Sequence, residues 1–190
     1  MKYLTFILSF GALLFILCCG KEGSASRIDL DDEKFTNFQI TFNPVGGGDQ
    51  IIFGYENIEN VGVQQAAASG PLQVKTLYDA RVVLFNRSVE PNKNLTESVI
   101  ESGVDYQLYP IVQPDNIFQN IEYADMDDNG NPIGMNMSFE TSERFVVGNL
   151  GFVLLRRGDK SARYIPGQEL PVGIGGEVLV EANFEVVIRE

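Results

Sequence analysis

The stretch "GPLQVKTLYDARVVLFN", residues 70–86, decides the fold class of this chain. From Tyr78 to Leu84 every second residue is apolar, and the charged residues Asp79 and Arg81 lie between them. Because successive side chains of a strand point to opposite faces of its sheet, this period of two predicts a β-strand with one buried face. The same period recurs on both sides of this stretch.

Many short strands are predicted by this repeated alternation. Phe38, Ile40 and Phe42 form one such run, and further apolar runs include residues 105–112 and 117–124. Glycine-rich or polar turns separate several of the runs, a spacing that is typical of a β-sandwich. The longest run, near the C-terminus, comprises Val178, Val180, Ala182, Phe184, Val186 and Ile188, which are expected to share one face.

One short helix is expected at "NLTESVIES", residues 94–102. Asn94 is in position to cap it, Glu97 follows three residues later as in a capping box, and the helix should end before Gly103. The predicted fold class is therefore all-β, a sandwich with one short helix.

The order of Leu72, Thr76 and Tyr78 ahead of a strand resembles the approach to the sixth strand of fibronectin type III domains. In such sandwiches the tyrosine hydroxyl hydrogen bonds to upstream backbone at the corner of the sheet. The resemblance implies an immunoglobulin/fibronectin-III-like β-sandwich in which Tyr78 is a structural corner residue. The alternative is an ordinary strand that happens to start with a tyrosine.

The N-terminus carries an apolar run, Leu4–Leu17, which is shorter than the roughly 20 residues of a membrane-spanning helix but suits a secretory signal. The end of this run, "ILCC" at 16–19, resembles the lipobox of bacterial lipoproteins. It implies a lipoprotein signal peptide over residues 1–18 and lipidation of Cys19. A lipidated Cys18 would instead be preceded by a bulky leucine, and an uncleaved anchor helix is a further alternative.

Composition beyond the signal predicts one domain on a tether. Residues 19–34 are small and charged and are expected to be a flexible tether, which leaves 35–190 as one β-sandwich domain. The whole chain has a formal charge of −12, so repulsion from phosphate makes nucleic acid an improbable partner. Attachment to a membrane would come from the N-terminal acyl chains.

Catalysis is constrained by the absence of histidine and tryptophan and by the placement of both cysteines in the leader region. Ser-His-Asp and Cys-His nucleophilic catalysis and histidine-ligated metals are thereby excluded. The chain contains 26 acidic residues, so cleavage of glycosides by paired carboxylates stays open, but no pair is singled out. The expectation is a protein without enzymatic activity that requires no cofactor.

The segment "DMDDNGNPIG", residues 125–134, is the one candidate metal site. Asp125, Asp127 and Asn129 match the first half of an EF-hand-type calcium loop, but its twelfth position is Asn136 instead of glutamate. One interpretation is weak calcium binding. The other is a plain hairpin turn, which Asn129 followed by glycine strongly favours.

Several segments taken together resemble an uncharacterised family of Bacteroidota outer-membrane lipoproteins. These proteins are often labelled "type 1 periplasmic binding fold" and accompany TonB-dependent receptors. Two family positions that carry histidine correspond to Tyr106 and Arg157 here, which puts any metal role at those positions in doubt. The segments that carry the resemblance, in chain order, are "ITFNPVGGG", "GPLQVKTLYDARVVLFNRSVEPNKNLTESV", "YADMDDNGNPIGM", "GFVLLRR" and "GGEVLVEANFEVVI".

The resemblance implies a lipid-anchored binding or accessory module of the outer membrane, with an outer-membrane β-barrel receptor or complex as its partner. The lysine and glutamate after Cys19 resemble the export tags of some surface-exposed lipoproteins, so either a periplasmic or a cell-surface orientation is open. The alternative function is a structural surface protein or adhesin without a small-molecule ligand.

Overall fold

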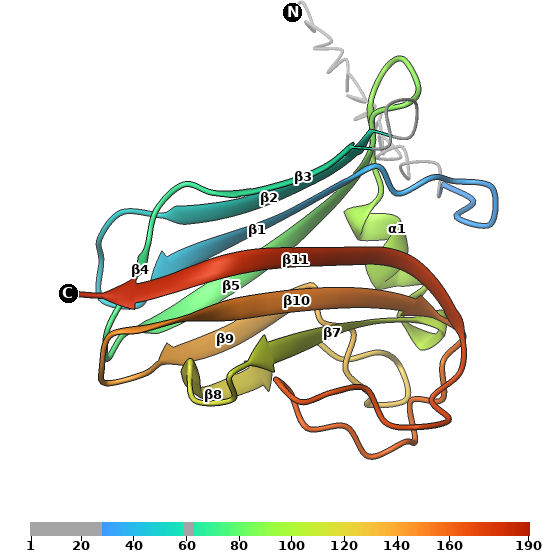
Figure 1. The fold of residues 1–190 in the computed structure, drawn as a ribbon. Helices are drawn as coiled ribbons and strands as arrows, with labels where there is room; N and C mark the ends of the chain where they lie inside the picture. Colours follow the sequence, from blue (N-terminus) through green and yellow to red (C-terminus); the bar gives the residue numbers. More distant parts are fainter. Residues whose placement is uncertain (1–27, 59–62) are drawn as a thin grey trace, which may run out of the picture.

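The computed structural model describes residues 28–58 and 63–190, which form two β-sheets packed face to face (Figure 1). The large sheet has seven strands in the order β3-β2-β1-β5-β9-β8, with β6 pairing β5. The small sheet has four strands in the order β4-β11-β10-β7. The predicted all-β sandwich with one short helix is confirmed.

The elements have the following bounds. The large sheet comprises β1 (Asn37–Pro44), β2 (Ile51–Ile58), β3 (Val63–Ala68), β5 (Leu77–Asn86), β6 (Lys93–Asn94), β8 (Phe118–Tyr123) and β9 (Asn136–Thr141). The small sheet comprises β4 (Leu72–Gln73), β7 (Tyr106–Gln113), β10 (Val146–Arg156) and β11 (Glu177–Arg189). The helix α1 (Thr96–Glu101) is followed by the single 3₁₀ turn η1 (Gly103–Asp105).

The segment 70–86 belongs to both sheets. Its first part forms β4, which pairs in parallel with the end of β11, and its second part forms β5 in the middle of the large sheet. Tyr78 stands at the start of β5, close to the place where the chain crosses from one sheet to the other.

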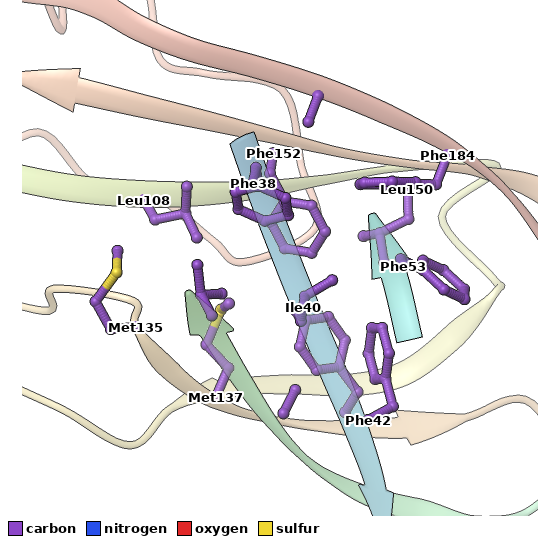
Figure 2. Packing of buried hydrophobic residues seen from close by; sticks show 14 of the residues in the cluster. Phe38, Ile40, Phe42, Phe53, Leu108, Met135, Met137, Leu150, Phe152 and Phe184 are labelled. Atoms are coloured by element: carbon purple, nitrogen blue, oxygen red, sulfur yellow. The ribbon is translucent and has the colours of Figure 1, made fainter. Parts of the chain in front are cut away.

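The core lies between the sheets and is rich in phenylalanine. Figure 2 shows Phe38, Ile40 and Phe42 of β1 among side chains from the facing strands. The Phe38 and Phe152 ring centroids are 5.1 Å apart across the sandwich, and those of Phe42 and Phe53 are 5.0 Å apart within the large sheet. Burial of each such ring contributes about 1.5–3 kcal/mol to stability, so these contacts are a main source of stability for the described residues, which contain no cysteine.

The C-terminal strand departs from its predicted alternation at Val178, whose side chain is 56% exposed. Leu154 pairs with Val180 and Leu155 with Val178, so Leu179 is an extra residue in β11. A bulge of this kind shifts the register by one residue and reverses the faces of the side chains before it. The five residues from Val180 to Ile188 share the buried face as expected.

The helix starts one residue later than the predicted cap implies. Its N-cap residue is Leu95, and the side chain of Asn94 accepts a hydrogen bond from the Thr96 backbone N–H at 3.0 Å. Glu97 lies 3.7 Å from Arg81 on the surface, and the described contacts do not include the reciprocal bond of a capping box.

The last part of the predicted tether, residues 28–34, contacts the domain. Leu30 is only 6% exposed and belongs to the main core, Asp31 pairs with Arg156 at 2.8 Å, and Glu33 pairs with Lys93. Within the described chain, one buried leucine and the ion pairs of Asp31 and Glu33 therefore hold this segment on the sandwich, ahead of the predicted boundary at residue 35. Residues 19–27 lie outside the described residues.

Candidate functional site

The edge of β11 that faces away from β10, called the open edge below, has no strand partner over most of its length, although β3 of the large sheet lies close to β11. Only Ile188 and Arg189 pair with β4 on that side, whereas β10 pairs the other side from Glu177 to Ile188. Within residues 28–58 and 63–190, no strand pairs with the open edge between Glu177 and Val187. Unpaired backbone donors and acceptors at such an edge can receive an added strand.

A surface groove of about 380 Å³ lies beside this open edge. Its walls come from β3 in the large sheet and from the end of β11, and its lining includes Phe184, a core residue that is only 2% exposed. The β3 wall consists of three consecutive exposed alanines, whose small side chains leave the backbone accessible. The lining residues include Ala66, Ala67, Ala68, Pro71, Phe184 and Val187.

Two exposed glutamates on β11 give the open edge a negative charge. Glu185 lines the groove, and the charge of Glu181 acts on the Tyr55 hydroxyl of the large sheet. Burial is the larger cause that raises the pKa of Tyr55, and the charge of Glu181 raises it further. No ion pair of Glu181 or Glu185 is found within the described residues, although Arg189 lies at the far end of the groove.

The opposite edge of the small sheet is covered. The Val112 N–H donates to Gly167 O at 2.8 Å, and the Gly167 N–H donates to Pro110 O at 3.0 Å, so the loop after β10 lies along β7. This loop also packs on the outer face of the small sheet, where Tyr109, Val153, Leu155 and Ile174 form a second buried cluster. The small sheet thus has one edge that a loop covers, on β7, and one open edge, on β11.

The predicted calcium residues are brought together in one loop but are bound to groups of the protein. Asp125 Oδ1 accepts the Gly134 N–H at 2.7 Å, and its Oδ2 accepts the N–H groups of Met135 and Asn136 at 2.9 Å each. The Asn136 side chain, at the twelfth position of the predicted loop, also donates to Asp125 Oδ2 at 3.3 Å. The first and twelfth positions therefore bind each other.

Asp127 forms a buried ion pair with Lys160. Lys160 Nζ lies 2.9 Å from Asp127 Oδ2 and also donates to Gly103 O and Pro132 O, while the two side chains are 8% and 1% exposed respectively. Burial, the largest effect, raises the pKa of Asp127. The hydrogen bonds from Lys160 and from the Asn131 and Asn129 N–H groups outweigh it and hold this pKa below its ordinary value.

The geometry of this segment is that of a hairpin turn. Met126 and Pro132 form an antiparallel bridge, Gly130 has φ +79°, and its N–H donates to Asp127 O at 2.9 Å. Among the residues that the structure describes, no three histidine, cysteine or acidic side chains are grouped to hold a metal. Calcium binding by Asp125, Asp127 and Asn129 stays a prediction, and a bound ion would have to displace existing hydrogen bonds.

Tyr78 occupies the place expected of a corner residue. Its ring is 1% exposed, and its hydroxyl oxygen accepts the backbone N–H of Gln73 at 2.8 Å. The Gln73 carbonyl accepts the hydroxyl of the buried Thr141 at 2.6 Å. Side chains of the large sheet therefore bind both the backbone N–H and the carbonyl of Gln73 in β4.

A second pocket, of about 370 Å³, lies between residues 28–31 and the end of η1. Tyr106 and Arg157, the two positions that the resemblance singled out, both line it, together with Asp31 and Asp105. The Arg157 N–H donates to Asp105 O at 2.7 Å, which fixes the start of the loop after β10 beside η1. The fold thus brings together two positions that are far apart in the sequence.

Sequence patterns did not identify the open edge or Lys160. The alternation in β11 placed Glu181 and Glu185 opposite the buried face, but edge status depends on pairing with β4, more than 100 residues earlier. Lys160 meets Asp127 from a loop 33 residues later in the chain. Neither relationship leaves a local signal in the sequence.

Cys19 and the predicted signal peptide lie outside the described residues. Among the residues described, no helix is long and apolar enough to cross a membrane. Comparisons of the chain with family models, curated proteins and solved structures find no match.

Proposed function

We propose that this protein is a lipid-anchored, non-catalytic binding module of the outer membrane that acts as an accessory to a TonB-dependent or other β-barrel receptor. The observation that carries the binding role is the open edge of β11 with its adjoining groove. An unpaired strand edge beside a groove is suited to hold a segment of another protein.

The anchoring part of the proposal rests on the lipobox resemblance at residues 16–19 and on where the folded chain begins. Residues 28–34 are held at one end of the sandwich, near α1, whereas the groove lies toward the end where β11 finishes (Figure 1). An anchor upstream of Ile28 would leave the groove accessible to a neighbouring protein in the same membrane.

Lipidation is tested by metabolic labelling with a clickable fatty acid, followed by membrane fractionation. Cys19→Ala is expected to lose the label and to leave the membrane or persist as precursor, and Cys18→Ala is expected to keep both label and location. A Cys19→Ala protein that is still labelled, together with an unlabelled Cys18→Ala protein, would refute this assignment.

The accessory role is tested by affinity purification of the full-length protein from membranes in mild detergent, with mass spectrometry of the captured proteins. A β-barrel receptor in about equal amount is the expected result. Binding only to matrix or host material, without a membrane receptor, would contradict the proposal and favour a structural surface protein or adhesin.

A further inference from the structure

We propose that the open edge of β11 binds an extended, basic segment of a partner protein as an added β-strand, with one apolar side chain of that segment seated in the groove. This inference names the surface used in the proposed binding role and rests on that role. Three features of the edge carry it: its free peptide groups, its groove and its charge.

The first feature is a row of free peptide groups. Arg189 O accepts the Val74 N–H at 3.1 Å, so the peptide groups of Arg189 point toward the open side. Because backbone groups alternate between the two edges of a strand, those of Val187, Glu185 and Asn183 point the same way. Val187 adjoins the pair of Ile188 with Leu72 and belongs to the ladder with β4, whereas Glu185 and Asn183 have no strand partner on this side within the described chain. Their peptide groups can therefore form a ladder with an added strand.

The second feature is the groove at the end of this row. Its volume of about 380 Å³ is lined in part by Phe184, whose ring packs 5.4 Å from that of Phe53. This part of the lining therefore belongs to the fixed core and is already in place before a ligand arrives. An apolar side chain of an added strand would bury its surface here against Pro71 and the exposed alanines of β3, which gives the edge a position that selects register.

The third feature is the negative charge along the strand. Glu181 and Glu185 are exposed, share one face of β11 and lie four residues apart, about 13 Å along a strand. Glu177 lies before the bulge at Leu179, which reverses its face, and it is paired with Arg156 at 2.5 Å. Lysine or arginine at alternate positions of an added strand would lie near Glu181 and Glu185, so the edge selects a basic segment.

The same charges argue against a second copy of this chain as the occupant. Two β11 edges paired antiparallel would bring glutamates of one copy near those of the other, and like charges across a strand pair are destabilising. The whole chain is also acidic, with a formal charge of −12. A basic partner segment is favoured by both observations.

The test uses a fluorescein-labelled synthetic peptide of ten alternating lysines and valines, with binding to the mature protein followed by anisotropy. Wild type is expected to bind it, and affinity should fall as NaCl is raised from about 50 to about 500 mM. The double variant Glu181→Gln, Glu185→Gln, called the β11 variant below, is expected to bind the peptide about tenfold more weakly. The same peptide with N-methyl groups on alternate backbone nitrogens should lose most of its affinity, because it cannot complete the ladder.

The matched control is Glu122→Gln with Glu140→Gln, which makes the same charge change at two exposed positions of the large sheet, on β8 and β9. Its affinity for the peptide should stay within about twofold of wild type. Equal binding by the β11 variant, equal binding of the N-methylated peptide, or no binding by wild type would each overturn the inference. A wild-type dimer in sedimentation that the β11 variant abolishes would also overturn it, because the occupant would then be a second copy.

Receptor capture separates this inference from the proposed function. If the β11 variant captures the receptor as well as wild type does, the accessory role stands and the open edge is not the docking surface. If wild type binds the basic peptide with the expected dependence on Glu181 and Glu185 but captures no receptor, the edge is a peptide site and the receptor proposal fails.

Discussion

The hydroxyl of Tyr78 accepts the backbone N–H of Gln73 at 2.8 Å, and this hydrogen bond joins the large sheet to the small one. The hydroxyl of Thr141, which is also in the large sheet, donates a hydrogen bond to the Gln73 carbonyl. The two-residue strand β4 is therefore positioned by side chains as well as by its pairing with β11. Since β4 marks the end of the open edge of β11, this corner helps to define the candidate binding surface.

Tyr78→Phe removes the hydroxyl and keeps the ring, so it isolates this hydrogen bond. The Gln73 N–H is left without its partner, and the variant should be less stable by about 1–2 kcal/mol. Tyr55→Phe is the matched control, because Tyr55 is also largely buried but no hydrogen bond of its hydroxyl is present among the described contacts. Urea denaturation of both variants gives the comparison, and an unchanged midpoint for Tyr78→Phe would contradict the corner role.

The sequence predicted the strands well because alternation is a local property of a chain that buries one face of each strand. It did not predict the exposure of Val178, because the bulge at Leu179 is set by pairing with β10. It assigned residues 28–34 to a tether, since two apolar residues, Ile28 and Leu30, among charges give too short a periodic signal.

The candidate calcium site was predictable only in part. Asp125, Asp127 and Gly130 were visible in the sequence, and so was the hairpin interpretation of the same residues. Their hydrogen-bond partners were not, because Lys160 arrives from a distant loop. The open edge of β11 follows from strand order, which depends on contacts between segments far apart in the chain.

Lys160→Met tests the buried ion pair. The substitution keeps most of the side-chain volume but leaves the Asp127 carboxylate buried without its cation, and Gly103 O and Pro132 O lose a donor. Removal of one partner of a buried pair costs about 3–5 kcal/mol. The exposed pair of Arg81 and Glu97 supplies the control, since Arg81→Met should cost less than about 1 kcal/mol in the same urea measurement. Equal effects of the two variants would show that burial of the pair is unimportant.

The ion pair also predicts the dependence of stability on acid. The folded Asp127 carboxyl has a pKa below the ordinary 3.8, so the unfolded chain binds this proton first as pH falls. The stability that the Asp127 carboxylate contributes is complete at pH values above its ordinary pKa. This stability is lost as pH falls from there through the lower pKa of the folded state. In Lys160→Met the same carboxyl is buried without its cation, and its folded pKa should lie above 3.8. The stability difference between wild type and Lys160→Met should therefore shrink as pH falls below about 5.

Urea midpoints of the two proteins between about pH 7 and pH 3 measure this difference. Carboxyl groups elsewhere, such as Glu33 beside Lys93, titrate in both proteins and cancel in the comparison. The variant Asp127→Asn removes the titrating group, and the further addition of Lys160→Met to it should give a stability cost that changes little over the same range. A difference between wild type and Lys160→Met that grows in acid would contradict this prediction.

Asp125 gives the last prediction, which separates a hydrogen-bonded turn from a calcium loop. Its carboxylate accepts three backbone N–H groups and the Asn136 side chain, so Asp125→Asn replaces one accepting oxygen with a donor and should cost about 1–3 kcal/mol.

If the segment is only a turn, the melting temperatures of wild type and variant should differ by the same amount in millimolar calcium and in chelator. If calcium binds weakly, a concentration of ten times Kd should stabilise wild type by about 1.4 kcal/mol and leave the variant unchanged. Asp128→Asn, a neighbouring exposed position, is the control for nonspecific charge effects. Because the first and twelfth positions of the loop already bind each other, we expect equal differences in both buffers, and a calcium-dependent rise confined to wild type would contradict that expectation.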